Sequence, residues 1–114
     1  MDLVVQTIVK NNYTVFKMTG DLNYDGILYL KQVFEEAFTR GVVQFVLDME
    51  NLRTISSYAL SIILKLSDTV KAKQGELKII CPAGNVSDVF NVLDIATVIP
   101  LYSSEDDLWK NTAQ

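Results

Sequence analysis

The sequence contains no histidine and only one cysteine among its 114 residues. Without histidine, neither a Ser-His-Asp nor a Cys-His catalytic arrangement can be built, and imidazole metal ligands are absent. The single cysteine, Cys81, can form neither an internal disulfide nor a thiolate zinc site. The phosphate-binding glycine patterns G-x-x-x-x-G-K-[ST] and G-x-G-x-x-G are also missing. We therefore expect a protein that is not an enzyme and that uses no metal and no cofactor.

Long apolar runs are absent as well. The longest, residues 58–66, is shorter than the ~18 residues that cross a bilayer, and Ser61 and Lys65 interrupt it. The first residues, Met1-Asp2-Leu3, lack the basic region and apolar core of a secretory signal peptide. We expect no membrane insertion and a cytoplasmic location, which suits a chain that forms no internal disulfide.

Positive charge is scarce. The sequence has ten Lys and Arg residues and 14 Asp and Glu residues, which gives a net charge of −4. The basic residues form no run. An acidic domain has no general attraction to nucleic acid phosphates, so direct nucleic-acid binding is disfavoured. The acidic pairs Glu35-Glu36 and Asp106-Asp107 are sequence neighbours on predicted helices, and they are interpreted as solvated surface.

Nearly half of the residues are apolar, which is ample for one core, and the length fits a single domain over residues 1–114. Cys81 ends the apolar run 77–81, so it is interpreted as a core residue, with redox regulation as the alternative.

Apolar periodicity predicts that strands and helices alternate along the chain. Two β-rich runs on either side of Asn11-Asn12 predict a hairpin, and Gly20 then breaks the pattern. The expected strands are residues 3–9, 13–19, 42–48 and 77–81, with an edge strand at Val98 and Ile99. The expected helices are residues 27–39, with Asn23 or Asp25 as cap, a second from Ser56 or Ser57 to about Gln74, residues 86–93, and a last one from Ser103 or Ser104.

The order β-β-α-β-α-β-α-β-α predicts an α/β domain whose sheet has parallel crossovers after the hairpin. Residues 49–55 are interpreted as a connection between a buried strand and the most apolar helix.

Ser56 and Ser57 stand at the start of that helix. Serine is a preferred N-cap because its hydroxyl accepts a hydrogen bond from an unpaired helix N–H group, so capping alone explains the pair. The same unpaired N–H groups and the positive end of the helix dipole also favour an added phosphate. A phosphoserine there would bring about two negative charges to the surface and switch docking without unfolding the domain.

The sequence resembles the STAS domain family, the bacterial anti-sigma factor antagonists, from about Val4 to Leu108. Five segments carry the resemblance: Gly20-Asp21-Leu22-Asn23, Val46 through Leu52, Ile55 through Leu60, Gly75-Glu76-Leu77, and Val89 through Leu93. They resemble, in order, the family's G-E-L-D turn, its central strand, its D-S-S-G-L phosphorylation motif, its G-G-x-L strand start and an amphipathic stretch. The resemblance implies a four- or five-stranded mixed sheet with helices packed mainly on one face.

For function, the resemblance implies reversible docking onto an anti-sigma factor that is a serine kinase, with a phosphatase that resets the switch. This is a role in signal transduction and transcription regulation. Aligned on Leu60, the phosphoacceptor of the family is Ser57, while Ser56, Tyr58 and Ala59 replace the family's Asp, Ser and Gly. The expected partner-binding residues are Asn23, Tyr24, Asp25, Ser56, Ser57 and Tyr58.

Two other functions stay open. The chain can be a constitutive, unphosphorylated STAS subunit of a sensory, stressosome-like or lipid-transport assembly, which the altered motif favours. A nucleotide- or small-ligand-binding domain is a further alternative, because a helix N-terminus can also hold a ligand phosphate.

Overall fold

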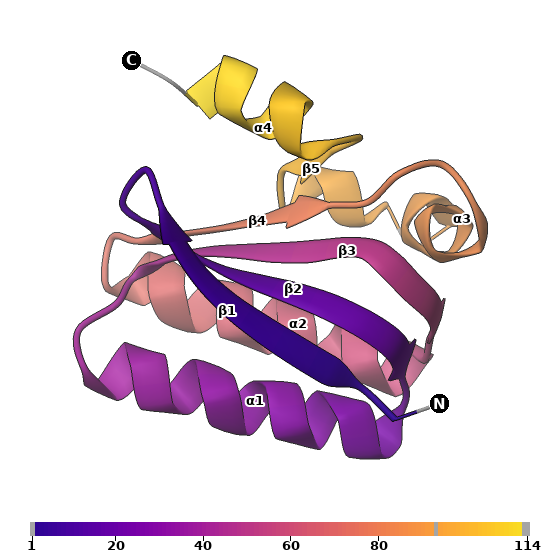
Figure 1. Cartoon of the computed structure of the whole chain (residues 1–114), viewed down its shortest axis with the longest axis horizontal. Helices are drawn as coiled ribbons and strands as arrows, with labels where there is room; N and C mark the ends of the chain where they lie inside the picture. Colours follow the sequence, from indigo (N-terminus) through magenta and orange to yellow (C-terminus); the bar gives the residue numbers. More distant parts are fainter. Residues whose placement is uncertain (1, 93, 113–114) are drawn as a thin grey trace.

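Strands and helices alternate along the chain in the computed structural model, which describes residues 2–92 and 94–112 (Figure 1). The described elements are β1 Val4–Lys10, β2 Tyr13–Leu22, α1 Tyr24–Thr39, β3 Gln44–Ile55, α2 Ser57–Ala72, β4 Glu76–Ile80, α3 Asn85–Val92, a 3₁₀ helix Ile95–Thr97, β5 Leu101–Tyr102 and α4 Glu105–Thr112. This order confirms the predicted α/β class. Leu93, which was expected to end α3, lies outside the described residues.

The five strands form one mixed sheet in the order β1-β2-β3-β4-β5. β1 is antiparallel to β2, and the other neighbouring strands are parallel. Asn11 and Asn12 join β1 to β2 with φ angles of 53° and 69°. Two central residues with positive φ are typical of a type I′ turn, which asparagine tolerates well, so the predicted hairpin is confirmed.

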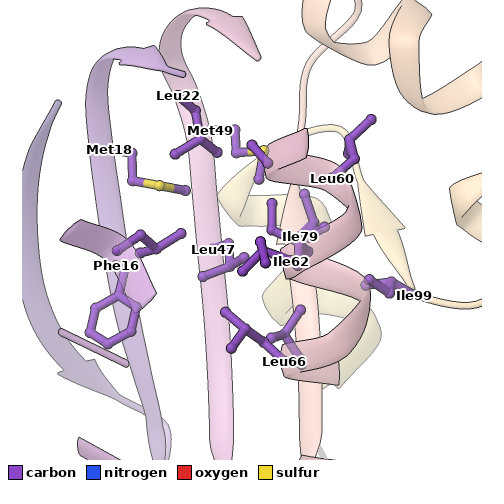
Figure 2. Close-up of a cluster of buried hydrophobic side chains, with 14 of the residues drawn as sticks. Phe16, Met18, Leu22, Leu47, Met49, Leu60, Ile62, Leu66, Ile79 and Ile99 are labelled. Atoms are coloured by element: carbon purple, nitrogen blue, oxygen red, sulfur yellow. The ribbon is translucent and has the colours of Figure 1, made fainter. Parts of the chain in front are cut away.

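The main core lies between the sheet and two long helices, α1 and α2, which run along one face (Figure 1). Apolar side chains three and four residues apart on each helix meet alternate residues of β2, β3 and β4. Figure 2 shows part of this cluster: Phe16, Met18, Leu22, Leu47, Met49, Leu60, Ile62, Leu66, Ile79 and Ile99. Cys81 belongs to the same core and is 7% exposed, as expected for an apolar cysteine.

The opposite face of the sheet is covered in part by α4, above the sheet in Figure 1. Here Leu108 is fully buried against a smaller cluster made by Tyr13, Val15, Val46 and Ile80. The two clusters use alternate residues of the same strands, because successive side chains of a strand point to opposite faces. Two helices, α1 and α2, thus pack on one face and α4 on the other.

Two predicted boundaries are wrong near the end of the sheet where β2 and β3 finish. β2 continues through Gly20 to Leu22, and the supposed connection 49–55 is the second half of β3. The last residues of β2 pair with the second half of β3, and the register shifts after Lys17 and after Gly20. Beyond Asp48, β3 no longer pairs with β4, so its residues there are mostly exposed and do not show the apolar pattern of a buried strand.

The predicted edge strand at Val98 and Ile99 is also wrong. Ile99 is buried, but it follows the 3₁₀ helix Ile95–Thr97, and the strand comes after Pro100, at Leu101–Tyr102. The longest described helices, α1 and α2, have 16 residues each, and no helix in the described parts of the chain has both the length and the apolar character needed to cross a membrane.

Candidate partner-binding site

The starts of α1 and α2 lie side by side at the end of the sheet where β2 and β3 finish. β2 ends at Leu22 and β3 at Ile55, and these two residues are paired neighbours in the sheet. A single residue, Asn23 or Ser56, then connects each strand to its helix. The Ser56 N–H group donates a hydrogen bond of 3.0 Å to the Leu22 carbonyl oxygen, which ties the two connections together.

Asn23 and Ser56 are the N-caps of the two helices. The Asn23 side-chain oxygen accepts a hydrogen bond of 2.9 Å from the Gly26 N–H group, and the Ser56 hydroxyl oxygen accepts one of 3.0 Å from the Ala59 N–H group. Both residues have extended backbone, as N-caps do. The sequence left Asn23 or Asp25, and Ser56 or Ser57, as alternatives. The structure selects Asn23 and Ser56.

Since Ser56 is the cap, Ser57 is the first residue of α2 and its side chain is exposed. The N–H groups at the start of a helix have no acceptor within the helix, and the partial positive charge of the dipole is concentrated there. The Ser57 hydroxyl therefore lies on the surface at a position where negative charge is stabilised. Ala59, which replaces the family's Gly in the expected motif, is fully buried.

Tyr58 and Tyr24 form an exposed aromatic pair across the two helix starts. Their ring centroids are 5.2 Å apart with an angle of 34° between the ring planes. Tyr58 is 44% exposed and Tyr24 58% exposed, so the pair presents a large apolar area to solvent. Asp25 is exposed in the first turn of α1, next to Tyr24 in sequence.

All six residues expected to bind a partner therefore gather at one edge of the molecule. We call them the helix-start surface: Asn23, Tyr24, Asp25, Ser56, Ser57 and Tyr58. Ser56 is half-buried because it caps α2, and the other five are exposed. Their gathering follows from the topology. Two neighbouring parallel strands end on the same side of the sheet, so the helices that follow them also begin there.

An ion pair beside this surface was missed in the sequence. Arg53 donates two hydrogen bonds to Asp21, from Nε to Oδ1 at 3.1 Å and from Nη2 to Oδ2 at 2.9 Å. The Thr54 hydroxyl donates a third, at 2.9 Å. These bonds, led by the one from Arg53, hold the pKa of Asp21 well below its usual range. The network joins the ends of β2 and β3 and so fixes the two helix starts relative to each other.

The sequence gives little indication of this ion pair. Asp21 follows a glycine in an expected turn and Arg53 lies in an expected connection, so neither residue is assigned to a strand. Recognising residues 49–55 as a strand that pairs with β2 would have brought Asp21 opposite Thr54, which is the observed register.

A groove between α1 and α2 starts at Tyr58 and was also not foreseen. Its volume is about 690 Å³. Both helices contribute apolar and charged side chains to its lining, which includes Phe34, Phe38, Tyr58, Ile62, Lys31, Glu35 and Lys65. The groove extends the aromatic surface of the Tyr24–Tyr58 pair along the helices.

Acidic groups elsewhere in the described residues form no cluster that could bind a metal ion. Asp48 is buried on the second face of the sheet, where its Oδ1 accepts a hydrogen bond from the Glu50 N–H group. Burial and the nearby Asp48 carboxylate raise the pKa of Glu50 above its usual value. Within residues 2–92 and 94–112, no three His, Cys, Asp or Glu side chains cluster closely enough to hold a metal ion.

Comparison with known families and structures gives a consistent result. The family model described as the STAS domain matches residues 4–108. No curated protein sequence is significantly similar to this chain. Among solved structures, an anti-sigma factor antagonist from Mycobacterium paratuberculosis has a TM-score of 0.88 at 13% identity, with 99% of this chain and 96% of that chain covered.

A candidate anti-sigma factor antagonist from Thermotoga maritima has a TM-score of 0.87 at 16% identity, with 96% and 95% of the two chains covered. The anti-sigma factor antagonist SpoIIAA in its unphosphorylated form has a TM-score of 0.74 at 15% identity, with 96% of both chains covered. SpoIIAA of Bacillus is also known in a phosphorylated form, with a TM-score of 0.72 at 15% identity, covering 96% and 99% of the two chains. At these identities the comparisons establish a shared fold.

Proposed function

The chain belongs to the STAS domain family, and we propose that it is an anti-sigma factor antagonist that binds an anti-sigma factor with serine kinase activity through the helix-start surface. The observation that carries the proposal is the exposed Ser57 hydroxyl at the start of α2, beside the exposed Tyr24–Tyr58 pair. Exposed aromatic residues that are held in place by a neighbour often anchor protein interfaces. The fold shared with antagonists of known structure supports the same role.

Phosphorylation of Ser57 is the proposed switch. A phosphate on Ser57 would lie at the N-terminus of α2, where the helix dipole and unpaired N–H groups stabilise negative charge. The domain would therefore stay folded. The same charge, next to Tyr58 and Tyr24, would disrupt an interface that buries these rings, because an unpaired charge is costly to desolvate. A phosphatase would restore binding.

The test is phosphorylation of the purified chain by its cognate anti-sigma factor kinase with ATP, followed by mass spectrometry of the intact protein and its peptides. We expect one phosphate on Ser57 and none on Ser57→Ala. The matched control is Ser61→Ala, since Ser61 is an exposed serine one turn further along α2 whose hydroxyl donates to the Tyr58 carbonyl oxygen. Ser61→Ala should be phosphorylated as the wild type is.

If the wild-type chain binds the kinase and gains no phosphate on Ser57, the switch is refuted and docking remains. If it does not bind any anti-sigma factor, the antagonist function itself is wrong.

One observation favours a second function, that of a constitutive STAS subunit in a sensory, stressosome-like or lipid-transport assembly. The aromatic pair is already formed in the unmodified chain, so a stable interface does not need a switch. Affinity purification from the native cell separates the two functions: a sensor or transport subunit as the main partner would favour the constitutive role, and an anti-sigma factor would favour the antagonist.

A further inference from the structure

The two edges of the sheet are built differently. β5, at one edge, has only two residues, and α4 follows directly after it. β1, at the other edge, has seven residues and pairs only with β2 among the described elements. In Figure 1, β1 lies in front of the sheet with no helix over its outer edge. A short edge strand offers little to pair with, whereas a long one offers a row of unpaired backbone N–H and C=O groups.

The sequence of β1 does little to protect this edge, because its one charged residue, Lys10, is the last residue of the strand. Natural edge strands usually carry charges, prolines or bulges that prevent pairing with another chain. Residues 3–9 contain no charged residue, no proline and no glycine, and the pairing with β2 is regular throughout. Val4 is 60% exposed and Val9 is 74% exposed, on opposite faces of the strand.

The turn at Asn11-Asn12 determines which groups of β1 point outward. Lys10 and Tyr13 flank this two-residue turn and pair with each other, so the backbone groups of Lys10 are directed at β2. Backbone groups alternate in direction along an antiparallel strand. Ile8, Gln6 and Val4 therefore also use theirs on β2, and the N–H and C=O groups of residues 3, 5, 7 and 9 face outward.

We propose that β1 pairs antiparallel with β1 of a second copy of this chain, in the register that places Gln6 opposite the partner's Gln6. In this register the outward-facing residues pair with each other: residue 3 lies opposite residue 9, and residue 5 opposite residue 7. Shifting the register by two residues still brings outward-facing groups together, but it pairs fewer of residues 3, 5, 7 and 9 with one another. The result is one continuous sheet of ten strands with a two-fold axis beside Gln6.

Side chains support this register. Asp2, which is exposed, lies opposite Lys10 of the other copy at each end of the interface, so opposite charges meet twice. The Lys10 ammonium group already contacts Glu105 at 2.9 Å, and it has three hydrogens with which to bind a second carboxylate. Val4 lies opposite Ile8 on one face, and Leu3 lies opposite Val9 on the other, so the exposed valines are covered.

The interface uses none of the six residues of the helix-start surface, so it is independent of the proposed function. An interface of one strand from each copy is small, and small interfaces are weak and reversible. We therefore expect dimers that form over the range from about 10 µM to about 1 mM.

The experiment is sedimentation equilibrium of the full chain across this range, with the charge variants Gln6→Lys and Gln6→Glu. Gln6 is exposed, so both variants should fold. Each variant alone places like charges directly opposite each other across the axis, whereas a one-to-one mixture places opposite charges there. At low salt we expect each single variant to dimerise more weakly than the wild type, and the mixture to dimerise about tenfold more tightly than either variant alone.

Hydrogen exchange gives a second readout. The amides of Val5, Thr7 and Val9 should gain protection as concentration rises, while those of Gln6 and Ile8 are protected at all concentrations by β2. A wild-type chain that stays monomeric at about 1 mM overturns the proposal, including the case in which β1 pairs with a different protein. A dimer that the Gln6 variants and their mixture do not change overturns it as well.

Discussion

At the scale of single residues, Asp21 has the clearest electrostatic role. Its carboxylate accepts hydrogen bonds from Arg53 and Thr54, and these keep its pKa well below the ordinary value. A group whose pKa is lowered by folding stabilises the native state above its unfolded pKa of about 4, and this contribution is lost as the pH falls toward its folded pKa. Asp21 should therefore stabilise the protein fully at neutral pH.

We predict that Asp21→Asn lowers the melting temperature at pH 7 and that the difference from the wild type shrinks below about pH 4. Thermal unfolding followed by circular dichroism from pH 7 to pH 2 measures this. Trp109 and Lys10 lower the pKa of Glu105 to about 2, so Glu105 also loses its charge at low pH. Because Glu105 is present in both proteins, the difference between their melting temperatures reports on Asp21 alone. A difference that stays constant down to pH 2 would show that Asp21 acts only through packing.

Cys81 lies in an environment that disfavours its thiolate form. Burial raises the pKa of the Cys81 thiol to about 11, and the side chain belongs to the main core. Because the thiolate is the reactive form, we predict that a thiol reagent at pH 8 labels the native protein at least roughly a hundredfold more slowly than the unfolded protein. Absorbance with a chromogenic disulfide in buffer and in guanidinium chloride measures both rates. Equal rates would support the redox role that the sequence left open.

At the scale of elements, the start of α1 depends on Gly26. Helix propensity alone predicts that Gly26→Ala stabilises the protein by about 1 kcal/mol. A Cβ atom on Gly26, however, would lie 2.7 Å from the Asp21 carbonyl oxygen, closer than real contacts allow. We predict a net destabilisation of about 1–3 kcal/mol, measured by chemical unfolding.

Gln32→Ala is the matched control for Gly26→Ala, because Gln32 is an exposed residue of the same helix and its replacement should change stability by less than about 0.5 kcal/mol. A stabilised Gly26→Ala protein would mean that propensity outweighs the contact, and that α1 is not held tightly against the end of β2.

The elements that sequence reasoning located well are those buried in the main core. The stripe over residues 27–39 and the apolar run 42–48 were recognised because burial against one face or two produces regular patterns. The second half of β3 was missed because it pairs only with β2 and its side chains are mostly exposed. The sequence pattern predicts a break at Gly20, although Gly20 lies within β2 at a register shift with β3. Val98 and Ile99 show that a short apolar run does not distinguish a strand from a turn, since Val98 is exposed and only Ile99 is buried.

At the scale of the whole molecule, topology explains why the six residues expected from the sequence lie together. The motif around Ser57 and the loop after β2 are about 30 residues apart in the chain, and the parallel pairing of β2 with β3 brings them together. The resemblance to STAS domains supplied both segments at once. The Tyr24–Tyr58 contact and the groove between α1 and α2 depend on the relative position of two helices, which no local pattern encodes. The Asp21–Arg53 pair depends in the same way on the pairing of β2 with the second half of β3.

A partner is proposed to dock on the helix-start surface, and the most direct test of this docking compares two tyrosines. Tyr58 and Tyr29 are 44% and 45% exposed, but only Tyr58 belongs to that surface. The measurement is the Kd of the anti-sigma factor for Tyr58→Ala and Tyr29→Ala by isothermal titration calorimetry. We predict that Tyr58→Ala weakens binding by about tenfold or more, and Tyr29→Ala by less than about twofold. Equal effects of the two substitutions, or a larger effect of Tyr29→Ala, would contradict the claim.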